Sequence, residues 1–409
     1  MRPSAWLLGL GLFAVSAAAH AEAVTDLALA PTADGFQLVV SKSGQVFTQA
    51  LALTAAPSGS PVVIASRRTV SPTAGGGAFV LAPGAKANLL SYREVLSDRT
   101  ENRYLLLPAR GSVVALSPKT LDPTASTSVT SRGAGGFFGL RAESSAYFAD
   151  LVTEDGTVTP VRVGALSSGM VDETKGEAVA VSYTGGVLRT VRLLPSGAPA
   201  TSLEDRTSAP GIVAPYFFGS DGDHHVFLGN RAGAGFAAVQ LSRSGEVAGG
   251  VASGPLGATL LAAASDSDAV FTVSDTPAGL VAHRVGRNLT VLPAGGVPLG
   301  RASTRPVAAA CSPAACAVAL YDGQVVRTLA VGRDNAVSGP FDVTIVVDPP
   351  PDAGTKPPTS SETVVSDPLF SDTGCSCAEV GTASGRGSFA ASAALVAVVA
   401  FVLRRRRRG

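Results

Sequence analysis

Histidine and cysteine are scarce in this chain, and each occurs only four times in 409 residues. Charged residues make up only 15% of the sequence, and no G-x-S-x-G hydrolase motif lies in a strand–turn–helix context. The glycine-rich stretches at residues 75–77 and 133–136 precede apolar strands and not helices, so they do not predict a phosphate-binding loop. The sequence therefore predicts no catalytic residues and no cofactor-binding site.

A basic surface is also absent from the main part of the chain. The two ends carry seven of the 32 Lys and Arg residues, which leaves 25 basic against 29 acidic residues over positions 24–374. Proteins that bind nucleic acid through the phosphate backbone need an excess of positive charge. We therefore expect no nucleic-acid partner.

Apolar and turn-forming residues are abundant. Hydrophobic residues make up 46% of the chain, which also contains 46 glycines and 27 prolines. Short apolar segments separated by Gly and Pro, without a long helical periodicity, are typical of many short β-strands. The composition therefore predicts an all-β fold.

The N-terminus has the organisation of a secretory signal peptide. Arg2 provides a positive charge, residues 6–19 form an apolar segment, and Ala-x-Ala cleavage sites follow at 19–21 and 21–23. We expect residues 1–23 to be removed and the mature protein to be exported.

A strand–turn–strand unit recurs along residues 24–347. Its copies occupy residues 36–51, 103–117, 147–163, 178–194, 225–241, 270–285 and 316–331. The turn glycines from Gly44 to Gly323 are on average 46.5 residues apart, although the interval is 67 after Gly44 and 30 after Gly156. Second turns follow in several copies, at Ser196-Gly197, Ser244-Gly245, Arg287-Asn288 and Arg333-Asp334. Each unit therefore has at least three strands.

A meander that repeats every ~40–50 residues is typical of a β-propeller blade. We predict a propeller of six to eight blades, most consistent with seven, over residues 24–347; two tandem β-sandwiches are the alternative. The irregular intervals indicate an inserted loop near residues 57–77 or a shortened blade near Gly164. Residues 24–30 and 341–347 are expected to pair, so that the first and last blades share a sheet.

Cys311 and Cys316 are the only cysteines in the predicted propeller. In an exported protein such a close pair predicts a disulfide. A redox-active pair is the alternative, although the usual C-x-x-C spacing is absent. A zinc site would need two further ligands, for which His224, His225 and His283 are the available histidines.

The densest polar cluster is formed by residues 220–225. Asp221, Asp223 and His224 are candidate ligands for a divalent cation such as Ca²⁺, or an acid/base pair. The alternative is a tight turn before a strand. The recurrence of Asp266-Ser267-Asp268 at the equivalent place in the next repeat favours the turn.

Residues 348–374 are rich in Pro, Ser, Thr and Asp, which predicts a disordered, extended linker. The chain then ends in three successive features. A cysteine motif consists of Gly374, Cys375, Ser376 and Cys377, an apolar run covers residues 389–403, and five arginines close the chain: Arg404, Arg405, Arg406, Arg407 and Arg408. The apolar run would form a membrane helix of roughly 22 Å, with the arginines on the cytoplasmic side.

This tail, residues 375–409 with the preceding glycine, resembles the myxobacterial C-terminal sorting signal called MYXO-CTERM. The resemblance implies a sorting or processing protease that acts at or near Cys375 and a protein held at the cell envelope or cell surface. An ordinary C-terminal membrane anchor is the alternative.

The sequence therefore predicts an exported, surface-anchored, non-catalytic binding or structural protein whose propeller contacts a protein or a polysaccharide. The alternative is a secreted propeller hydrolase or lyase that acts on glycans or peptides. That activity would require carboxylates to converge at the mouth of the central channel.

Overall fold

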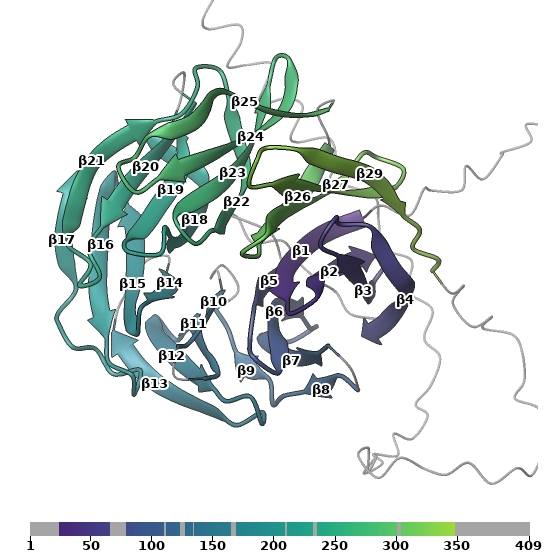
Figure 1. The fold of residues 1–409 in the computed structure, drawn as a ribbon. Helices are drawn as coiled ribbons and strands as arrows, with labels where there is room; N and C mark the ends of the chain where they lie inside the picture. Colours follow the sequence, from purple (N-terminus) through teal and green to yellow (C-terminus); the bar gives the residue numbers. More distant parts are fainter. Residues whose placement is uncertain are drawn as a thin grey trace, which may run out of the picture. The chain divides into compact units, whose positions relative to one another are not determined.

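The computed structural model describes residues 24–65, 79–109, 112–122, 127–133, 135–164, 169–208, 211–231, 235–300 and 304–347 (Figure 1). All regular elements in these ranges are β-strands. Within these ranges no helix has the length and apolar character needed to cross a bilayer. The predicted signal peptide, linker and C-terminal sorting segment, at residues 1–23, 348–374 and 375–409, lie outside the described residues.

The strands form seven sheets, which we number as blades 1 to 7, and each blade consists of strands that follow one another in the chain. Blade 1 contains β1 (Val24–Thr32), β2 (Gly35–Lys42), β3 (Gln45–Ala52) and β4 (Pro57–Ala65). Blade 2 contains β5 (Phe79–Ala82), β6 (Ala87–Val95), β7 (Thr100–Pro108), β8 (Val114–Ala115) and β9 (Lys119–Thr120). Blade 3 contains β10 (Ser128–Ser131), β11 (Phe137–Glu143), β12 (Ala146–Val152) and β13 (Val158–Gly164).

Blades 4 to 7 have four strands each. Blade 4 contains β14 (Gly169–Thr174), β15 (Glu177–Thr184), β16 (Val187–Leu193) and β17 (Glu204–Ser208). Blade 5 contains β18 (Ile212–Ser220), β19 (His225–Arg231), β20 (Gly235–Leu241) and β21 (Val247–Ser253). Blade 6 contains β22 (Thr259–Ser265), β23 (Ala269–Thr276), β24 (Gly279–Gly286) and β25 (Val291–Gly300). Blade 7 contains β26 (Thr304–Cys311), β27 (Ala315–Tyr321), β28 (Val326–Gly332) and β29 (Val337–Val343).

The blades are arranged around a ring, with the first strand of each blade innermost (Figure 1). Neighbouring inner strands contact one another all round, including β26 of blade 7 with β1 of blade 1. Seven clusters of buried hydrophobic residues lie in the described part, one between each pair of adjacent blades. Because each blade is covered on both faces, its central strands are almost continuously buried, as in β20. The prediction of a seven-bladed β-propeller is confirmed, and the alternative of two sandwiches is wrong.

The ring closes without a shared strand, so the expected pairing of residues 24–30 with 341–347 is wrong. β1 pairs with β2, and β29 pairs with β28. Blade 7 already has its fourth strand in chain order, so no place remains for a strand from the N-terminus. The seam is closed by side chains, in a cluster of 19 buried residues from blades 1 and 7 that extends to Ile345.

The irregular glycine intervals have a simple structural origin. Gly44 and Gly186 lie between the second and third strands of their blades, whereas Gly156 lies between the third and fourth. The irregular intervals therefore join glycines of two different turns, and blade 3 has its full four strands, the last ending at Gly164. Residues 57–65 of the predicted inserted loop form strand β4, and residues 66–77 lie outside the described residues.

The turn between the third and fourth strands, which we call the outer turn, has one geometry in six blades. The N–H of the first residue of this five-residue turn donates to the carbonyl of the fifth residue, and the N–H of the fourth residue donates to the carbonyl of the first. The six turns are residues 52–56, 153–157, 194–198, 242–246, 286–290 and 332–336. The fourth residue has a positive φ in every case: Ala55, Gly156, Gly197, Gly245, Leu289 and Asn335. The four predicted second turns all belong to this set.

Each outer turn packs on the preceding blade. The Thr190 hydroxyl of blade 4 donates to the Gly245 carbonyl at 3.0 Å, and the Thr328 hydroxyl of blade 7 donates to the Ala55 carbonyl at 2.7 Å. The seam between blades 7 and 1 therefore uses the same contact as the other blade interfaces.

We expect Gly245→Ala to lower the midpoint of urea unfolding, with a loss of about 1–3 kcal/mol. The residue has φ +88°, and an added Cβ would lie 3.0 Å from the Thr190 hydroxyl and 3.2 Å from Val179. Gly185→Ala is the control, because φ is +61° there but no atom lies within 4 Å of the added Cβ. Equal losses in the two variants would contradict close packing at this blade interface.

Candidate functional site

The polar cluster at residues 220–225 forms the inner turn of blade 5, the turn between its first and second strands. Asp221 is fully buried, and its Oδ1 accepts hydrogen bonds from the backbone N–H groups of Asp223 at 3.0 Å and His224 at 2.8 Å. Its Oδ2 accepts a hydrogen bond from Gln240 Nε2 at 2.6 Å. The interpretation of this segment as a tight turn is confirmed.

Asp223 lies on the surface of this turn and is contacted by three cations. Lys175 Nζ of blade 4 pairs with Oδ1, Arg287 Nη1 of blade 6 lies 2.6 Å from Oδ2, and Arg243 Nη2 of blade 5 lies 3.5 Å from Oδ1. The hydrogen bond from Lys175, together with the charges of Arg287, Lys175 and Arg243, lowers the pKa of the Asp223 carboxyl. The carboxylate is therefore ionised near neutral pH, and one acidic group joins three blades.

The candidate cation ligands Asp221 and Asp223 are engaged by other groups of the protein. Three positive side chains already surround Asp223, and the buried Asp221 carboxylate already accepts hydrogen bonds. Within the described ranges, the one group of three His, Cys, Asp or Glu side chains close enough to share an ion consists of Asp266, Cys311 and Cys316, and its two sulfurs are bonded to each other.

An open depression of about 470 Å³ lies beside this cluster, between blades 4 and 5. We call it the blade 4–5 depression. It is lined by Glu177, Asp223, His224, Ser242, Arg243 and Ser244. All of these side chains are polar, and they come from the inner and outer turns at one end of the blades. Such a surface can bind a polar ligand through hydrogen bonds and charge.

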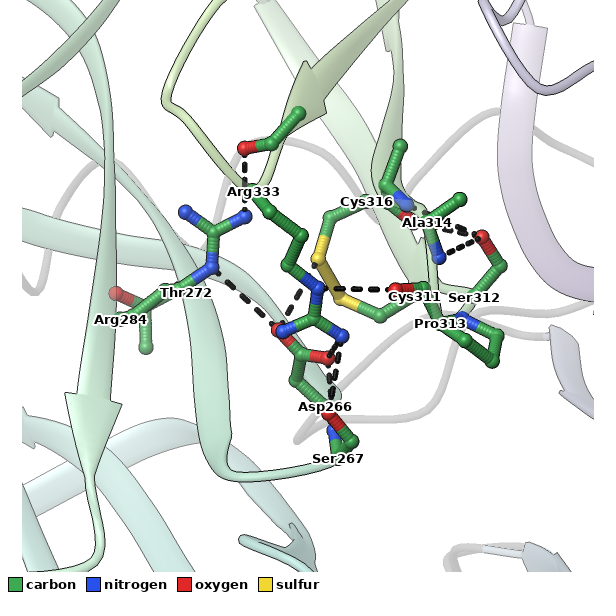
Figure 2. The surroundings of a disulfide bond; sticks show 12 residues. Asp266, Ser267, Thr272, Arg284, Cys311, Ser312, Pro313, Ala314, Cys316 and Arg333 are labelled. Atoms are coloured by element: carbon green, nitrogen blue, oxygen red, sulfur yellow. Dashed lines mark hydrogen bonds and ion pairs between the residues drawn. A yellow bond between two sulfur atoms is a disulfide. The ribbon is translucent and has the colours of Figure 1, made fainter.

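The predicted disulfide is confirmed (Figure 2). Cys311 and Cys316 are directly opposite each other in β26 and β27, and the turn between them is closed by a hydrogen bond from Ser312 N–H to Ala315 O at 2.8 Å. Arg333 lies between this turn and blade 6, with Nε donating to Pro313 O at 3.1 Å and Nη1 donating to Asp266 Oδ2 at 2.8 Å. The disulfide closes the turn that contains Pro313, and the carbonyl of Pro313 accepts the hydrogen bond that positions Arg333.

We expect Cys311→Ser with Cys316→Ser to lower the free energy of unfolding by about 2 kcal/mol, because the closed loop is short. The blade 4–5 depression is formed by other blades, so ligand binding there should be unchanged. Urea unfolding and a binding assay on the same preparation measure both effects. If the folded double variant bound the ligand more weakly than the wild type does, a purely structural role for this cysteine pair would be contradicted.

Two buried groups of titratable side chains were not anticipated from the sequence. His225 of blade 5 is fully buried, and its Nδ1 lies 2.7 Å from Asp172 Oδ2 of blade 4. Between blades 2 and 3, Asp150 Oδ2 accepts hydrogen bonds from Arg141 Nε at 2.8 Å and Tyr104 OH at 2.9 Å. Residues more than 40 positions apart form both contacts across blades, so no local pattern could reveal them.

The electrostatics of these groups follow from burial. Burial raises the pKa of the Asp150 carboxyl, and Arg141 opposes this effect. Burial, followed by the charge of Asp150, raises the pKa of the Tyr104 hydroxyl well above its usual range. Burial also lowers the pKa of His283, which lies within strand β24. No solvent reaches Asp150 or His225, so a substrate cannot contact either side chain in this conformation.

Carboxylates on the described parts of the inner strands are few. They are Asp26 of β1, and Asp172 and Glu173 of β14. Asp26 accepts a hydrogen bond from Phe79 N–H at 2.6 Å, and Glu173 is bonded to Gly133 N–H at 2.6 Å. These carboxylates belong to two separated blades and bind their own chain, so they do not converge on the channel.

No protein-family model matches this chain, and no curated protein matches it in sequence. Its fold is nevertheless widespread among solved structures. A catalytically inactive variant of virginiamycin B lyase from Staphylococcus aureus is similar with a TM-score of 0.50 and 10% identity, over 75% of this chain and 94% of that chain. A protein from Lactobacillus plantarum is similar with a TM-score of 0.50 and 13% identity, over 78% and 97% of the two chains.

A prolyl endopeptidase is a third similar structure, with a TM-score of 0.50 and 9% identity. The match covers 77% of this chain and 49% of that chain. At these identities the similarity concerns the fold alone. The class of protein is therefore a seven-bladed β-propeller, and this class includes proteins of different activities.

Proposed function

We propose that this protein is an exported binding protein of the cell surface, which uses the blade 4–5 depression to bind a polysaccharide or a protein and catalyses no reaction. The observation that carries the proposal is this open depression, which is formed by turns of two blades and lined by charged and polar residues. Enzyme pockets usually enclose their substrate and contain a few converging reactive groups. The depression is instead open and suits a ligand that extends beyond it.

The arrangement of acidic groups supports a non-catalytic role. The carboxylates of the inner strands bind backbone N–H groups or the buried His225. The ionisable groups with raised pKa, Asp150 and Tyr104, are buried between blades. A general acid or base must come within hydrogen-bond distance of its substrate, and these groups do not.

Localisation forms the second part of the proposal. The N-terminal signal segment and the MYXO-CTERM-like tail support export, processing near Cys375 and retention at the cell envelope. Cell fractionation followed by N-terminal sequencing tests this part. Full-length protein in the cytosol with an intact Met1 would contradict it.

Binding of the full-length protein to isolated cell envelopes, with calcium or with EDTA, tests the binding function. We expect saturable binding that EDTA does not weaken, because three cations occupy the surroundings of Asp223. Absence of saturable binding would contradict the proposal. Turnover of a glycan or peptide substrate would instead support a secreted hydrolase or lyase.

A further inference from the structure

The second residue of the outer turn usually contacts the inner turn of the preceding blade. In blade 3, Glu154 Oε1 accepts a hydrogen bond from Ala85 N–H of blade 2 at 2.9 Å. In blade 4, Pro195 O accepts a hydrogen bond from Arg132 Nη2 of blade 3 at 2.9 Å. The blades are therefore joined at this end by a repeated polar contact.

In blades 6 and 7 the same position is an arginine that binds a carboxylate. Arg287 Nη1 lies 2.6 Å from Asp223 Oδ2 of blade 5. Arg333 of blade 7 donates two hydrogen bonds to Asp266 of blade 6, one of them from Nη1 at 2.8 Å. In both cases the arginine reaches back by one blade to an acidic inner turn.

Among the described residues, Arg243, the corresponding residue of blade 5, has no carboxylate of the preceding blade as a partner. The inner turn of blade 4 is Lys175-Gly176, so a cation lies where the later blades have a carboxylate. Arg243 instead contacts Asp223 of its own blade, with Nε 3.4 Å from O and Nη2 3.5 Å from Oδ1. These contacts are long, and Asp223 already binds Arg287 and Lys175 at shorter distances. The Arg243 side chain is 45% exposed.

The surroundings do not supply the missing anion. Glu177 lines the same depression, but it is paired with Arg192 at 3.0 Å. Lys175, Arg243 and Arg287 thus share the single surface carboxylate of Asp223. These three basic side chains around one surface carboxylate are a local excess of positive charge. Residues 24–374 as a whole carry 25 basic and 29 acidic residues, so such an excess is unusual in this chain.

We propose that Arg243, which lines the depression, and Lys175, which contacts the same Asp223 carboxylate at its edge, form a subsite for an anionic group of an acidic polysaccharide. The inference rests on the proposed function, because it names the ligand of the same depression. An anion at this position gives Arg243 the charge-assisted hydrogen bonds that Arg287 and Arg333 obtain from protein carboxylates. The hydroxyls of Ser242 and Ser244 and the imidazole of His224 line the same surface and can bind sugar hydroxyls.

The polar lining favours a polysaccharide over an acidic peptide. Peptide and protein partners usually bind through buried aromatic or aliphatic anchors, which need apolar pockets. The depression is open, and no aliphatic side chain and no Phe, Tyr or Trp lines it, so it offers no such pocket. A chain of hydroxylated, charged sugars matches this surface.

The test measures binding of the full-length protein to four polymers: polygalacturonate, dextran sulfate, neutral dextran and poly-glutamate. We expect polygalacturonate or dextran sulfate to bind most tightly, and the better of the two identifies carboxylate or sulfate as the anionic group. Arg243→Gln should weaken that binding about tenfold, since it removes a charge-assisted bidentate donor. Lys175→Gln should have the same direction of effect, and both losses should shrink in high salt.

Arg189→Gln is the matched control, because Arg189 of blade 4 is an exposed arginine that pairs with Asp205 outside the depression. It should leave binding unchanged. Unfolding curves of all variants must overlap with that of the wild type, which excludes loss of fold as the cause.

The remaining outcomes overturn the inference. A dissociation constant of Arg243→Gln within twofold of the wild-type value would contradict an anion subsite. Binding of neutral dextran as tight as that of the anionic polymers would also contradict it. Both results would leave the proposed function standing. Tighter binding of poly-glutamate would favour an acidic protein partner. If envelopes bind the protein but none of the four polymers does, the inference alone fails. If envelopes do not bind either, the proposed function fails as well.

Discussion

Arg141→Met is expected to destabilise the protein by about 3–5 kcal/mol at pH 8, because it leaves a buried carboxylate without its cation. Arg141 Nε lies 2.8 Å from Asp150 Oδ2, and its Nη1 donates to Thr120 O at 2.8 Å. The methionine retains apolar contact with the Phe148 ring, over which the guanidinium lies at 5.0 Å. The loss therefore reports mainly on charge and hydrogen bonding.

The destabilisation should depend on pH in a defined direction. Burial already raises the pKa of Asp150, and the nearby Arg141 lowers it, so removal of Arg141 raises the folded-state pKa further. A carboxyl whose folded pKa exceeds its unfolded pKa stabilises the fold below the unfolded value and loses that contribution as pH rises through the folded value. The deficit of the variant should therefore shrink as the pH falls from 8 towards the ordinary pKa range of aspartate.

Urea unfolding of both proteins across this pH range measures the effect. Arg189→Met provides the control, because Arg189 pairs with Asp205 on the surface and such pairs contribute about 0–1 kcal/mol. A deficit that is the same at all pH values would contradict the role given to the Asp150 charge.

Ile345→Ala should destabilise the protein by about 2–5 kcal/mol, the range for truncating a buried aliphatic residue. Ile345 follows the last strand and is 7% exposed within the cluster that joins blades 7 and 1. Its carbonyl accepts a hydrogen bond from Lys42 Nζ of blade 1 at 3.0 Å. No described strand pairs across the boundary between blades 7 and 1. The segment around Ile345 therefore holds these two blades together through packing and a hydrogen bond.

Val346→Ala is a matched control for the seam, because the neighbouring side chain is 73% exposed. We expect a change of less than about 0.5 kcal/mol there. Thermal unfolding of both variants compares the two positions. An equal, small effect of Ile345→Ala and Val346→Ala would show that the segment after β29 does not hold the ring closed.

The blade repeat could be predicted from the sequence because a blade is a local structure. Its strands and turns follow one another in the chain, so apolar segments and turn residues recur with the blade period. The disulfide was predictable for the same reason, since Cys311 and Cys316 are joined by one short turn. The acidic turn at Asp221 was also predictable, because an aspartate before a tight turn bonds to the N–H groups that follow it.

Contacts between blades were beyond sequence reasoning. Asp150 and Tyr104 meet only after two blades have packed together, and so do Asp172 and His225. The closure of the ring was predicted wrongly for a related reason. The ring could close by pairing of the two chain ends as strands or by side-chain packing between complete blades. Both arrangements require apolar residues at positions 24–30 and 341–347, so the apolar pattern of the sequence did not distinguish them.

The candidate site was predicted only in part. Asp221, Asp223 and His224 were correctly identified as a polar cluster at a turn, but the cations around Asp223 come from turns up to 64 residues away. Lys175 and Arg287 carry no local signal that connects them with Asp223. The role of Arg243 emerges only from comparison of the outer turns in three dimensions.

Hydrogen–deuterium exchange of the full-length protein, with and without isolated cell envelopes, tests the central claim most directly. The account predicts that envelope binding slows exchange at the residues that line the blade 4–5 depression, which are residues 177, 223–224 and 242–244. The equivalent outer turns of blades 1 and 7, residues 52–56 and 332–336, should exchange as in the free protein. Saturating binding that protects other surfaces and leaves the blade 4–5 turns unchanged would contradict the account.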